Sequence, residues 1–193
     1  NNSKWGVWSI DATYLAISYN TISNMKEDGI QLENTASSSI SGNSINNCGD
    51  PAISLYYSSN ITVKNNTLLE SWQGIFSEDA TSLIVRRSYS SSISGNLIQN
   101  CADKAIALFT LTDVTVENNT LMDSIWGVWS NNATSLVVSN ASITGIFLKD
   151  AASSSVSGNS INNCEDAAIS LFDSSYVTVE NSTLVDSNWG IDD

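Results

Sequence analysis

An eleven-residue stretch that occurs three times most constrains what this chain can fold into. It reads SSISGNSINNC at 38–48, SSISGNLIQNC at 91–101 and SSVSGNSINNC at 154–164. Each copy is followed by a small residue and Ile, and then by an Asn-rich segment such as ITVKNNTLLES at 61–71. Repetition of this kind predicts a fold in which one structural unit is stacked on the next.

A small residue followed by an aliphatic residue marks the same point in every unit. Successive pairs are separated by 23, 23, 22, 31, 22, 18, 23 and 22 residues. Between them, apolar and polar residues alternate in short runs bounded by Ser, Asn and Gly, which predicts short strands and no helix. The pairs are Gly6-Val7, Gly29-Ile30, Ala52-Ile53, Gly74-Ile75, Ala105-Ile106, Gly127-Val128, Gly145-Ile146, Ala168-Ile169 and Gly190-Ile191.

Three short strands in a unit of roughly 22–23 residues are typical of a parallel β-helix. The pattern G-I-x-L, a Ser/Asn spacer and I-x-x-N-x-I-x-x-N resembles the repeat of copper-maturation periplasmic proteins of the NosD type. Archaeal cell-surface proteins and polysaccharide-cleaving β-helices share this pattern. The resemblance implies a right-handed parallel β-helix of about eight coils, and it leaves the function open because one scaffold serves many activities.

We predict one domain over residues 1–193, built of three super-repeats at 5–71, 72–125 and 126–188. The long step after Gly74 contains the only arginines, Arg86 and Arg87. They are either part of a solvated loop or a basic contact for an acidic neighbour or a carboxylated sugar.

The aliphatic residues of the alternating runs are expected to point inward and to stack from coil to coil. A recurring corner Asn is expected to adopt left-handed backbone and to hydrogen-bond the next coil. These corner residues are Asn43, Asn66, Asn96, Asn119 and Asn159. The predicted inward residues include Ile30, Leu32, Ile40, Ile45, Ile53, Leu55, Val63, Leu68, Ile106, Leu108, Ile169 and Leu171.

The charge balance of the chain excludes some classes of binding partner. The chain has 20 acidic and 7 basic residues, no His and a formal net charge of −13. This argues against nucleic acid as a partner, since nucleic-acid binding needs a basic surface. The chain lacks a long apolar run, so no membrane span is expected. Its Ser, Thr and Asn content is common in secreted solenoids and predicts an extracellular or cell-surface location, and the start without Met suggests a processed or excised chain.

The three cysteines recur one per copy of the repeated stretch. Cys48, Cys101 and Cys164 are about two and three coils apart, beyond the ~7 Å that a disulfide can bridge between Cα atoms. No intrachain disulfide is therefore expected. The thiols are either buried or used in an interchain link or a soft-metal site, and the lack of His and of C-x-x-C argues against a metal.

Acidic residues recur just before the small–aliphatic pairs. Asp28 and Asp50 should lie one coil apart, roughly 5 Å, which makes them a weak candidate for a Ca²⁺ site. The alternative is a solvated row of acids. We predict no catalytic residue and no cofactor, and we expect that the chain is not an enzyme.

Aromatic residues recur close to the same pairs. Trp8, Phe76 and Trp129 come two positions after Gly, and Tyr57 and Phe109 are assigned to the position after the I-x-L run, as is Phe172. Outward rings would bind sugars or a protein partner, and inward rings would cap the core. Both readings stay open.

The ends of the chain suggest a structural role. The chain ends at the same point of the repeat at which it begins, so the last coil of one copy could pair with the first coil of the next. We therefore predict head-to-tail contact between copies in a filament, sheath or surface layer. The contact would use Trp5, Val7, Ile10, Trp189 and Ile191. The alternatives are a carbohydrate-binding or polysaccharide-cleaving β-helix and a NosD-like accessory protein; the latter is disfavoured by the absence of His.

Glycans are possible partners if the chain is exported. The candidate N-glycosylation sites are Asn60, Asn65, Asn118, Asn132, Asn140 and Asn181.

Overall fold

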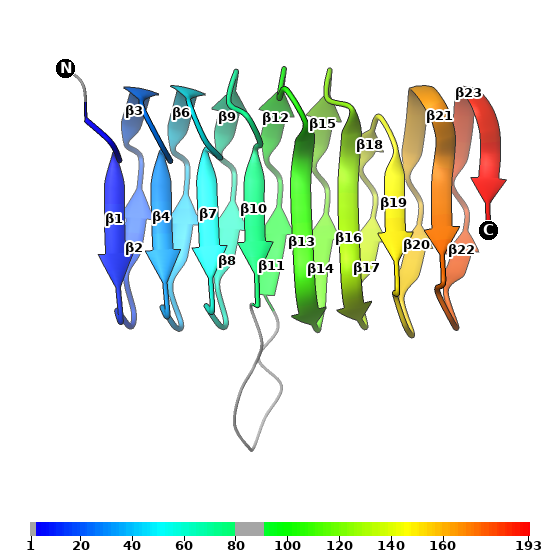
Figure 1. Cartoon of the computed structure of the whole chain (residues 1–193), viewed down its shortest axis with the longest axis horizontal. Coiled ribbons are helices and arrows are strands. Elements are labelled where there is room, and N and C mark those ends of the chain that lie inside the picture. Colours follow the sequence, from blue (N-terminus) through cyan, green and yellow to red (C-terminus); the bar gives the residue numbers. More distant parts are fainter. Residues whose placement is uncertain (1–2, 80–90) are drawn as a thin grey trace.

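The computed structural model describes residues 3–79 and 91–193. The chain forms a right-handed parallel β-helix of about eight turns, which confirms the predicted fold class. All the regular structure in the described ranges is β-strand. Figure 1 shows successive coils side by side along one axis, with the N-terminal coil at one end and the C-terminal coil at the other.

Each coil supplies strands to three faces, and every strand pair is parallel. Face 1 is the front layer in Figure 1. It contains β1 (Val7–Ile10), β4 (Ile30–Glu33), β7 (Ile53–Tyr56), β10 (Ile75–Glu78), β13 (Lys104–Thr112), β16 (Trp126–Thr134), β19 (Ile146–Lys149) and the end of β21 (Ser160–Phe172).

Face 2 is a separate sheet of eight strands. It contains β2 (Ala16–Ser18), β5 (Ser39–Ser41), β8 (Thr62–Lys64), β11 (Ser91–Ser94), β14 (Val114–Glu117), β17 (Val137–Ser139), β20 (Ser155–Ser157) and β22 (Thr178–Glu180). Face 3 contains β3 (Thr21–Met25), β6 (Ser44–Cys48), β9 (Thr67–Leu69), β12 (Leu97–Gln99), β15 (Thr120–Met122), β18 (Ser142–Ile143) and the first parts of β21 and β23 (Thr183–Asp192). Because β21 turns the corner without a break, faces 1 and 3 are joined into one sheet.

The core follows from strict register between coils. Ile75 lies between Ile53 and Ile106 on the neighbouring strands, and all three are fully buried. Burying one such side chain contributes about 1.5–3 kcal/mol, so a column of them stabilises the whole stack. All the predicted inward residues are buried except Leu171, which is only partly covered near the end of the chain.

The predicted Asn corner forms a ladder of hydrogen bonds inside the coil. The backbone N–H of Asn43 donates to Oδ1 of Asn66 at 2.9 Å, and the next steps of the ladder repeat this bond. The left-handed residue is the one before each ladder Asn, such as Gly42 (φ 66°) or Asn65 (φ 54°), so the prediction for the Asn itself is wrong. Gly and Asn tolerate this conformation best, which explains their place there.

At several pairs the small residue is required by close approach between coils. A Cβ added to Gly29 would lie 2.6 Å from the carbonyl oxygen of Ala52 in the next coil. The predicted basic contact of Arg86 and Arg87 lies outside the described residues. The division into three super-repeats stays a prediction.

Candidate functional site

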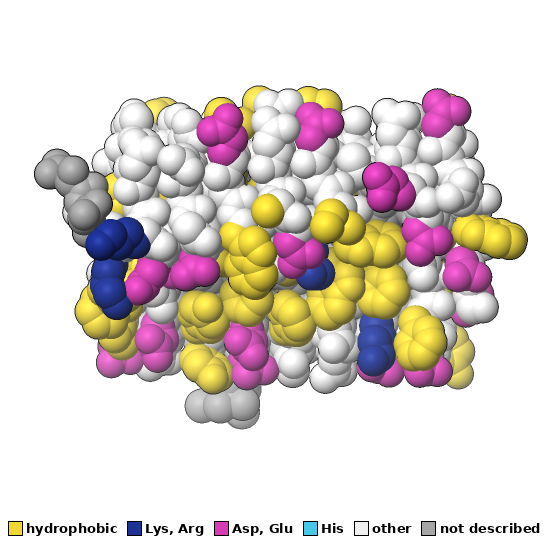
Figure 2. All heavy atoms as spheres, turned by 45° about the horizontal axis from the view of Figure 1, so that its top comes forward, with side chains coloured by type: hydrophobic (Ala, Val, Ile, Leu, Met, Phe, Trp, Pro, Cys, Tyr) yellow, Lys and Arg dark blue, Asp and Glu magenta, His cyan; other side chains and the backbone are white. Residues whose placement is uncertain are grey.

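Aromatic side chains form a continuous strip on the outside of face 1. Alternate residues of a strand point outward, and on five consecutive coils one of them is aromatic. Neighbouring rings are 4.9–5.6 Å apart between centroids, so each ring packs on the next. Figure 2 shows this apolar band over the middle coils, bordered by acidic side chains. The aromatic strip consists of Tyr56, Phe76, Phe109, Trp129 and Phe147.

The strip resolves the question of whether the rings point inward or outward. Phe76, Phe109 and Trp129 point outward and are half-buried against each other. The assignment of Tyr57 was wrong by one position. Tyr56 takes the place equivalent to Phe109, whereas Tyr57 lies at the exposed corner with φ 49°.

An acid and a base meet beside the middle of the strip. Nζ of Lys104 lies 2.6 Å from Oδ2 of Asp103, and it also lies 5.2 Å from the ring centroid of Trp129. Gln73 donates a hydrogen bond to the same carboxylate oxygen at 3.0 Å. Gln73 is only 4% exposed, and its Oε1 has no hydrogen-bond partner within the part of the chain that the structure describes.

A second polar cluster lies at the Tyr56 end of the strip. The hydroxyl of Ser54 donates to the carboxylate of Asp28, which is 7% exposed. Burial, reinforced by the charge of Asp50, raises the pKa of Asp28 above its usual range, although the bond from Ser54 opposes the shift. Burial and the nearby carboxylate of Asp28 also raise the pKa of Tyr56. Both groups therefore hold their protons to higher pH than free side chains do.

The two residues of the predicted Ca²⁺ pair interact electrostatically. Asp50 is close enough to Asp28 to raise its pKa, but Asp28 is engaged by Ser54. The described residues contain no group of three or more His, Cys, Asp or Glu that could hold a metal ion. The Ca²⁺ site stays a prediction.

A notch of about 660 Å³ opens where one coil is shortened. The chain passes from Ile143 at the end of face 3 to Ile146 at the start of face 1, whereas the next coil runs from Ile161 to Ile169. The missing corner leaves a hollow between the corners of the two neighbouring coils. Its walls include Ser124, Trp126, Thr144, Glu165 and Asp166.

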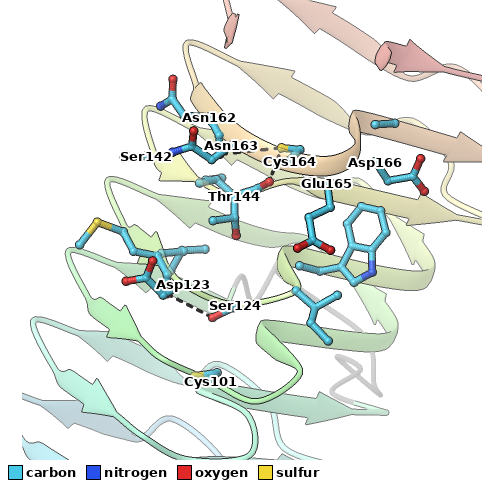
Figure 3. Close-up of a pocket in the computed structure, with 16 residues that line it drawn as sticks. Cys101, Asp123, Ser124, Ser142, Thr144, Asn162, Asn163, Cys164, Glu165 and Asp166 are labelled. Atoms are coloured by element: carbon cyan, nitrogen blue, oxygen red, sulfur yellow. Dashed lines mark hydrogen bonds between the residues drawn. The ribbon is translucent and has the colours of Figure 1, made fainter. Parts of the chain in front are cut away.

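Figure 3 shows how the labelled side chains face the notch. The carboxylate of Glu165 points into it, whereas that of Asp166 points away. The Oγ1 atom of Thr144 is buried and has no hydrogen-bond partner in the described part of the chain. Ser124 faces the same space, and its hydroxyl donates to the carbonyl of Met122 at 3.3 Å.

The notch joins the aromatic strip. The ring of Trp126, one wall of the notch, lies 5.5 Å from that of Phe147, which stacks on Trp129. Sequence reasoning missed the notch, although its signal was visible. The step of 18 residues from Gly127 to Gly145 is the shortest in the chain.

The three cysteines are free and buried, as predicted for small buried thiols. Cys48 aligns with Met25, and its backbone N–H donates to Oγ of Ser71 at 3.3 Å. Burial raises the pKa of Cys101 to about 11. Cys164 lines the notch, and its Sγ contacts the carbonyl oxygen of Thr144.

The residues of the predicted assembly contact lie at the two ends of the stack. Trp5, Val7 and Ile10 belong to the first coil, whose strand β1 pairs with β4 alone among the described strands. Trp189 and Ile191 lie on β23 and are 65% and 52% exposed. Head-to-tail contact stays a prediction.

The candidate glycosylation sites all lie at left-handed corners, with φ between 50° and 60°. Asn60 is half-buried and donates to Ser37, and the others are exposed. The exposed sites are Asn65, Asn118, Asn132, Asn140 and Asn181. Their modification stays a prediction.

A family model described as periplasmic copper-binding protein (NosD) matches residues 50–192, which is more than half of the chain. The chain belongs to the NosD family. A second model, described as right handed beta helix region, matches residues 1–88 of this NosD-family chain. Both matches confirm the resemblance seen in the repeat. No curated protein matches the chain by sequence.

The residues present do not fit the copper site that the NosD description implies. Copper in proteins is held by imidazole, thiolate or thioether ligands. This chain has no His. Its three thiols are buried in different coils, and the described ranges contain no group of three or more His, Cys, Asp or Glu that could hold a metal ion.

Solved structures with the same architecture act on polysaccharides, by their names. The A-module of mannuronan C-5 epimerase AlgE4 from Azotobacter vinelandii matches with a TM-score of 0.75 and 14% identity, over 93% of this chain and 55% of that one. An alginate lyase from Paenibacillus sp. matches with a TM-score of 0.75 and 14% identity, over 100% and 76%. The periplasmic alginate epimerase AlgG matches with a TM-score of 0.62 and 13% identity, over 93% of this chain and 47% of that one. This NosD-family chain thus spans about half the length of the two epimerase structures, and the likeness establishes the fold.

The prediction that the chain is not an enzyme is contradicted by this comparison, because the matching folds belong to two epimerases and a lyase. The structure also places an acid and a base together, Asp103 and Lys104, next to the aromatic strip. The periplasmic description agrees with a location outside the cytoplasm. No helix in the described ranges is long and apolar enough to cross a membrane. The cell-surface location and the filament stay predictions.

Proposed function

We propose that this protein binds a polysaccharide along face 1, parallel to the axis of the β-helix. The aromatic strip is the observation that carries the proposal. Its rings continue over five coils, from Tyr56 to Phe147, on the outside of the molecule. A linear polymer laid along the axis would meet one ring per coil, at intervals of about 4.8 Å.

The chemistry of the strip suits sugar rings. A pyranose has an apolar C–H face that packs on an aromatic ring, and hydroxyls at its edge that need polar partners. Lys104 lies over the ring of Trp129, and its partner Asp103, which also accepts from Gln73, adds a carboxylate, so the site offers both donors and acceptors. The named polysaccharide enzymes of the same fold support this choice of ligand class.

The charge of the protein selects among polysaccharides. With a net charge of −13, the protein repels a polyanion such as a uronic acid polymer. We therefore expect a neutral or cationic polymer, in contrast to the mannuronan and alginate named for the three solved structures.

Binding can be tested by affinity electrophoresis against a panel of neutral, anionic and cationic polysaccharides. Trp129→Ala should abolish retardation by a polymer that retards the unmodified protein, because it removes the ring that packs on both Phe109 and Phe147. Tyr176→Ala is the matched control, since Tyr176 is 88% exposed and lies outside the strip. Equal retardation of Trp129→Ala and Tyr176→Ala would contradict the proposal.

A second candidate function is cleavage or modification of the bound polymer. It is favoured by Tyr56 and Asp28, whose pKa values are both raised at one end of the strip. Groups with perturbed pKa values concentrate at catalytic sites. Tyr56 would contact the sugar and exchange a proton with it, while Asp28, joined to Ser54, would set the charge around the phenol.

Release of reducing ends or of unsaturated products from the retained polymer measures this activity. Tyr56→Phe should remove activity and leave binding intact, because the ring stays in the strip and only the hydroxyl is lost. Tyr57→Phe is the control, since that phenol lies at the neighbouring exposed corner. Product release from Tyr56→Phe at the unmodified rate would exclude this role.

A further inference from the structure

We infer that the notch binds the ammonium group of an amino sugar in the polymer that face 1 holds. The inference rests on the proposed polysaccharide binding and deepens it by naming the sugar. The notch opens beside the aromatic strip and has a volume of about 660 Å³. This volume lies within the range of small-molecule sites.

The notch lies directly beside the aromatic strip. Trp126 forms part of its wall, and the ring of Trp126 contacts that of Phe147 at 5.5 Å. A polymer that stacks on Trp129 and Phe147 would hold the substituents of these sugar units beside the mouth of the notch. The same chain of sugars would therefore occupy both places.

The side chains inside the notch suit a cation with hydrogen-bond donors. The carboxylate of Glu165 points into the cavity, and neither described ion pair involves it. Oγ1 of Thr144 is a buried hydroxyl oxygen without a partner in the described chain, and it can accept a hydrogen bond from a ligand. Trp126 adds an aromatic face, to which an ammonium group is attracted.

Other substituents would bind less well. A carboxylate would face Glu165 and the negative field of the whole chain. A neutral hydroxyl or N-acetyl group could donate a hydrogen bond to Glu165, but it would leave the negative charge of that carboxylate without a counter-charge. An ammonium group both neutralises that carboxylate and donates to the oxygen of Thr144, and bonds of this kind are the stronger class.

The notch can be tested with oligomers of glucosamine, whose amines are free, and with the same oligomers fully N-acetylated. Calorimetric titration at mildly acidic pH should give tighter binding of the free amine. Glu165→Gln should weaken binding of the free-amine oligomer about tenfold and leave the N-acetylated oligomer unchanged. Asp166→Asn is the matched control, because it removes the same charge from the neighbouring residue that points away from the notch. That variant should keep the preference.

The outcomes separate the two proposals. Trp129→Ala should weaken both oligomers, because it acts on the strip. Equal affinity for the two oligomers, or equal losses in Glu165→Gln and Asp166→Asn, would overturn the notch inference while polysaccharide binding stands. If neither oligomer nor any polymer of the panel binds, polysaccharide binding itself is wrong and the notch inference fails with it.

Discussion

Asn66 donates two hydrogen bonds to one oxygen atom, Oδ1 of Asn96: one from its backbone N–H at 2.9 Å and one from its side-chain Nδ2 at 3.1 Å. These residues are 30 positions apart in sequence. Asn43 makes the same pair of bonds to Asn66 at a separation of 23 positions, with lengths of 2.9 and 3.0 Å. The ladder thus keeps its geometry across the longest coil of the chain.

Loss of one ladder residue should destabilise the fold strongly. Asn66→Ala removes the oxygen that accepts from the backbone N–H and the Nδ2 of Asn43, and it removes the Nδ2 that donates to the carbonyl of Ile40. Each buried group left unpaired costs about 1–3 kcal/mol. Urea unfolding followed by circular dichroism should show this loss, whereas Asn131→Ala, on the outer side of β16, should stay within about 0.5 kcal/mol of the unmodified protein. Equal stability of the two variants would show that the ladder contributes little.

The ladder has a gap that can be filled. Ala141 occupies the ladder position after Asn119, so no side-chain oxygen stands opposite the backbone N–H of Asn119, although Ala141 itself donates to Asn159 at 3.1 Å. Ala141→Asn should raise the unfolding free energy by about 1 kcal/mol, the usual net contribution of a hydrogen bond. A lower unfolding free energy would mean that the corner of the shortened coil is too narrow for the amide.

The buried carboxyl of Asp28 should make the fold less stable as the pH rises. Its folded pKa lies above the ordinary value of 3.8, so the folded state binds the proton more tightly than the unfolded state does. The stability that the proton contributes is therefore present at low pH and lost as the pH rises through the folded pKa. Asp28→Asn should raise Tm at about pH 7 and leave it unchanged at about pH 3.

The size of this shift and its control follow from chain length and exposure. For a chain of this length, each kcal/mol appears as roughly 2–4 °C in Tm. Asp173→Asn changes an exposed corner carboxylate and should leave Tm unchanged at both pH values. If Asp28→Asn lowers Tm at neutral pH, the ionised carboxylate stabilises the fold.

The thiols should be inert in the folded protein. Burial raises the pKa of Cys101 to about 11 and also raises the pKa of Cys48 and of Cys164, so little thiolate forms at about pH 8. Iodoacetamide should leave the native thiols unmodified at that pH and alkylate all three after unfolding in guanidinium chloride. Alkylation of native Cys101 should accelerate as the pH approaches 11. Rapid reaction of the native protein at neutral pH would show that this corner opens.

The fold could be predicted because inward positions are set by the stack itself. Ile53 must fit between Ile30 and Ile75, so the same kind of side chain returns at every step and its period is visible in the sequence. The hydrogen-bonded ladder imposes a similar demand on Asn66. The inward aliphatic position and the Asn position both recur along the stack of coils, so both are visible as a repeat in the sequence.

The candidate site could not be predicted in the same way because outward residues carry no such demand. Phe109 uses the second outward position of its strand and Trp129 the first, yet their rings meet at 4.9 Å across the two coils. Only the register and ring directions reveal the strip. The short step to Gly145 indicated that one coil is smaller than the others. The walls of the notch, however, come from the coils before and after it, and residue spacing does not show which side chains face the cavity.

The shortened coil also shows how a solenoid of this type can change. Each coil contacts only its neighbours, so Ile143 and Ile146 keep their places in the two sheets although the corner between them has been cut away. A deletion of this size would disrupt the core of many globular proteins, but here it changes only one corner and leaves the strands in register. Moving the same deletion to another coil would move the hollow along the molecule by one strand spacing, which makes the location of a recess an adjustable property of this scaffold.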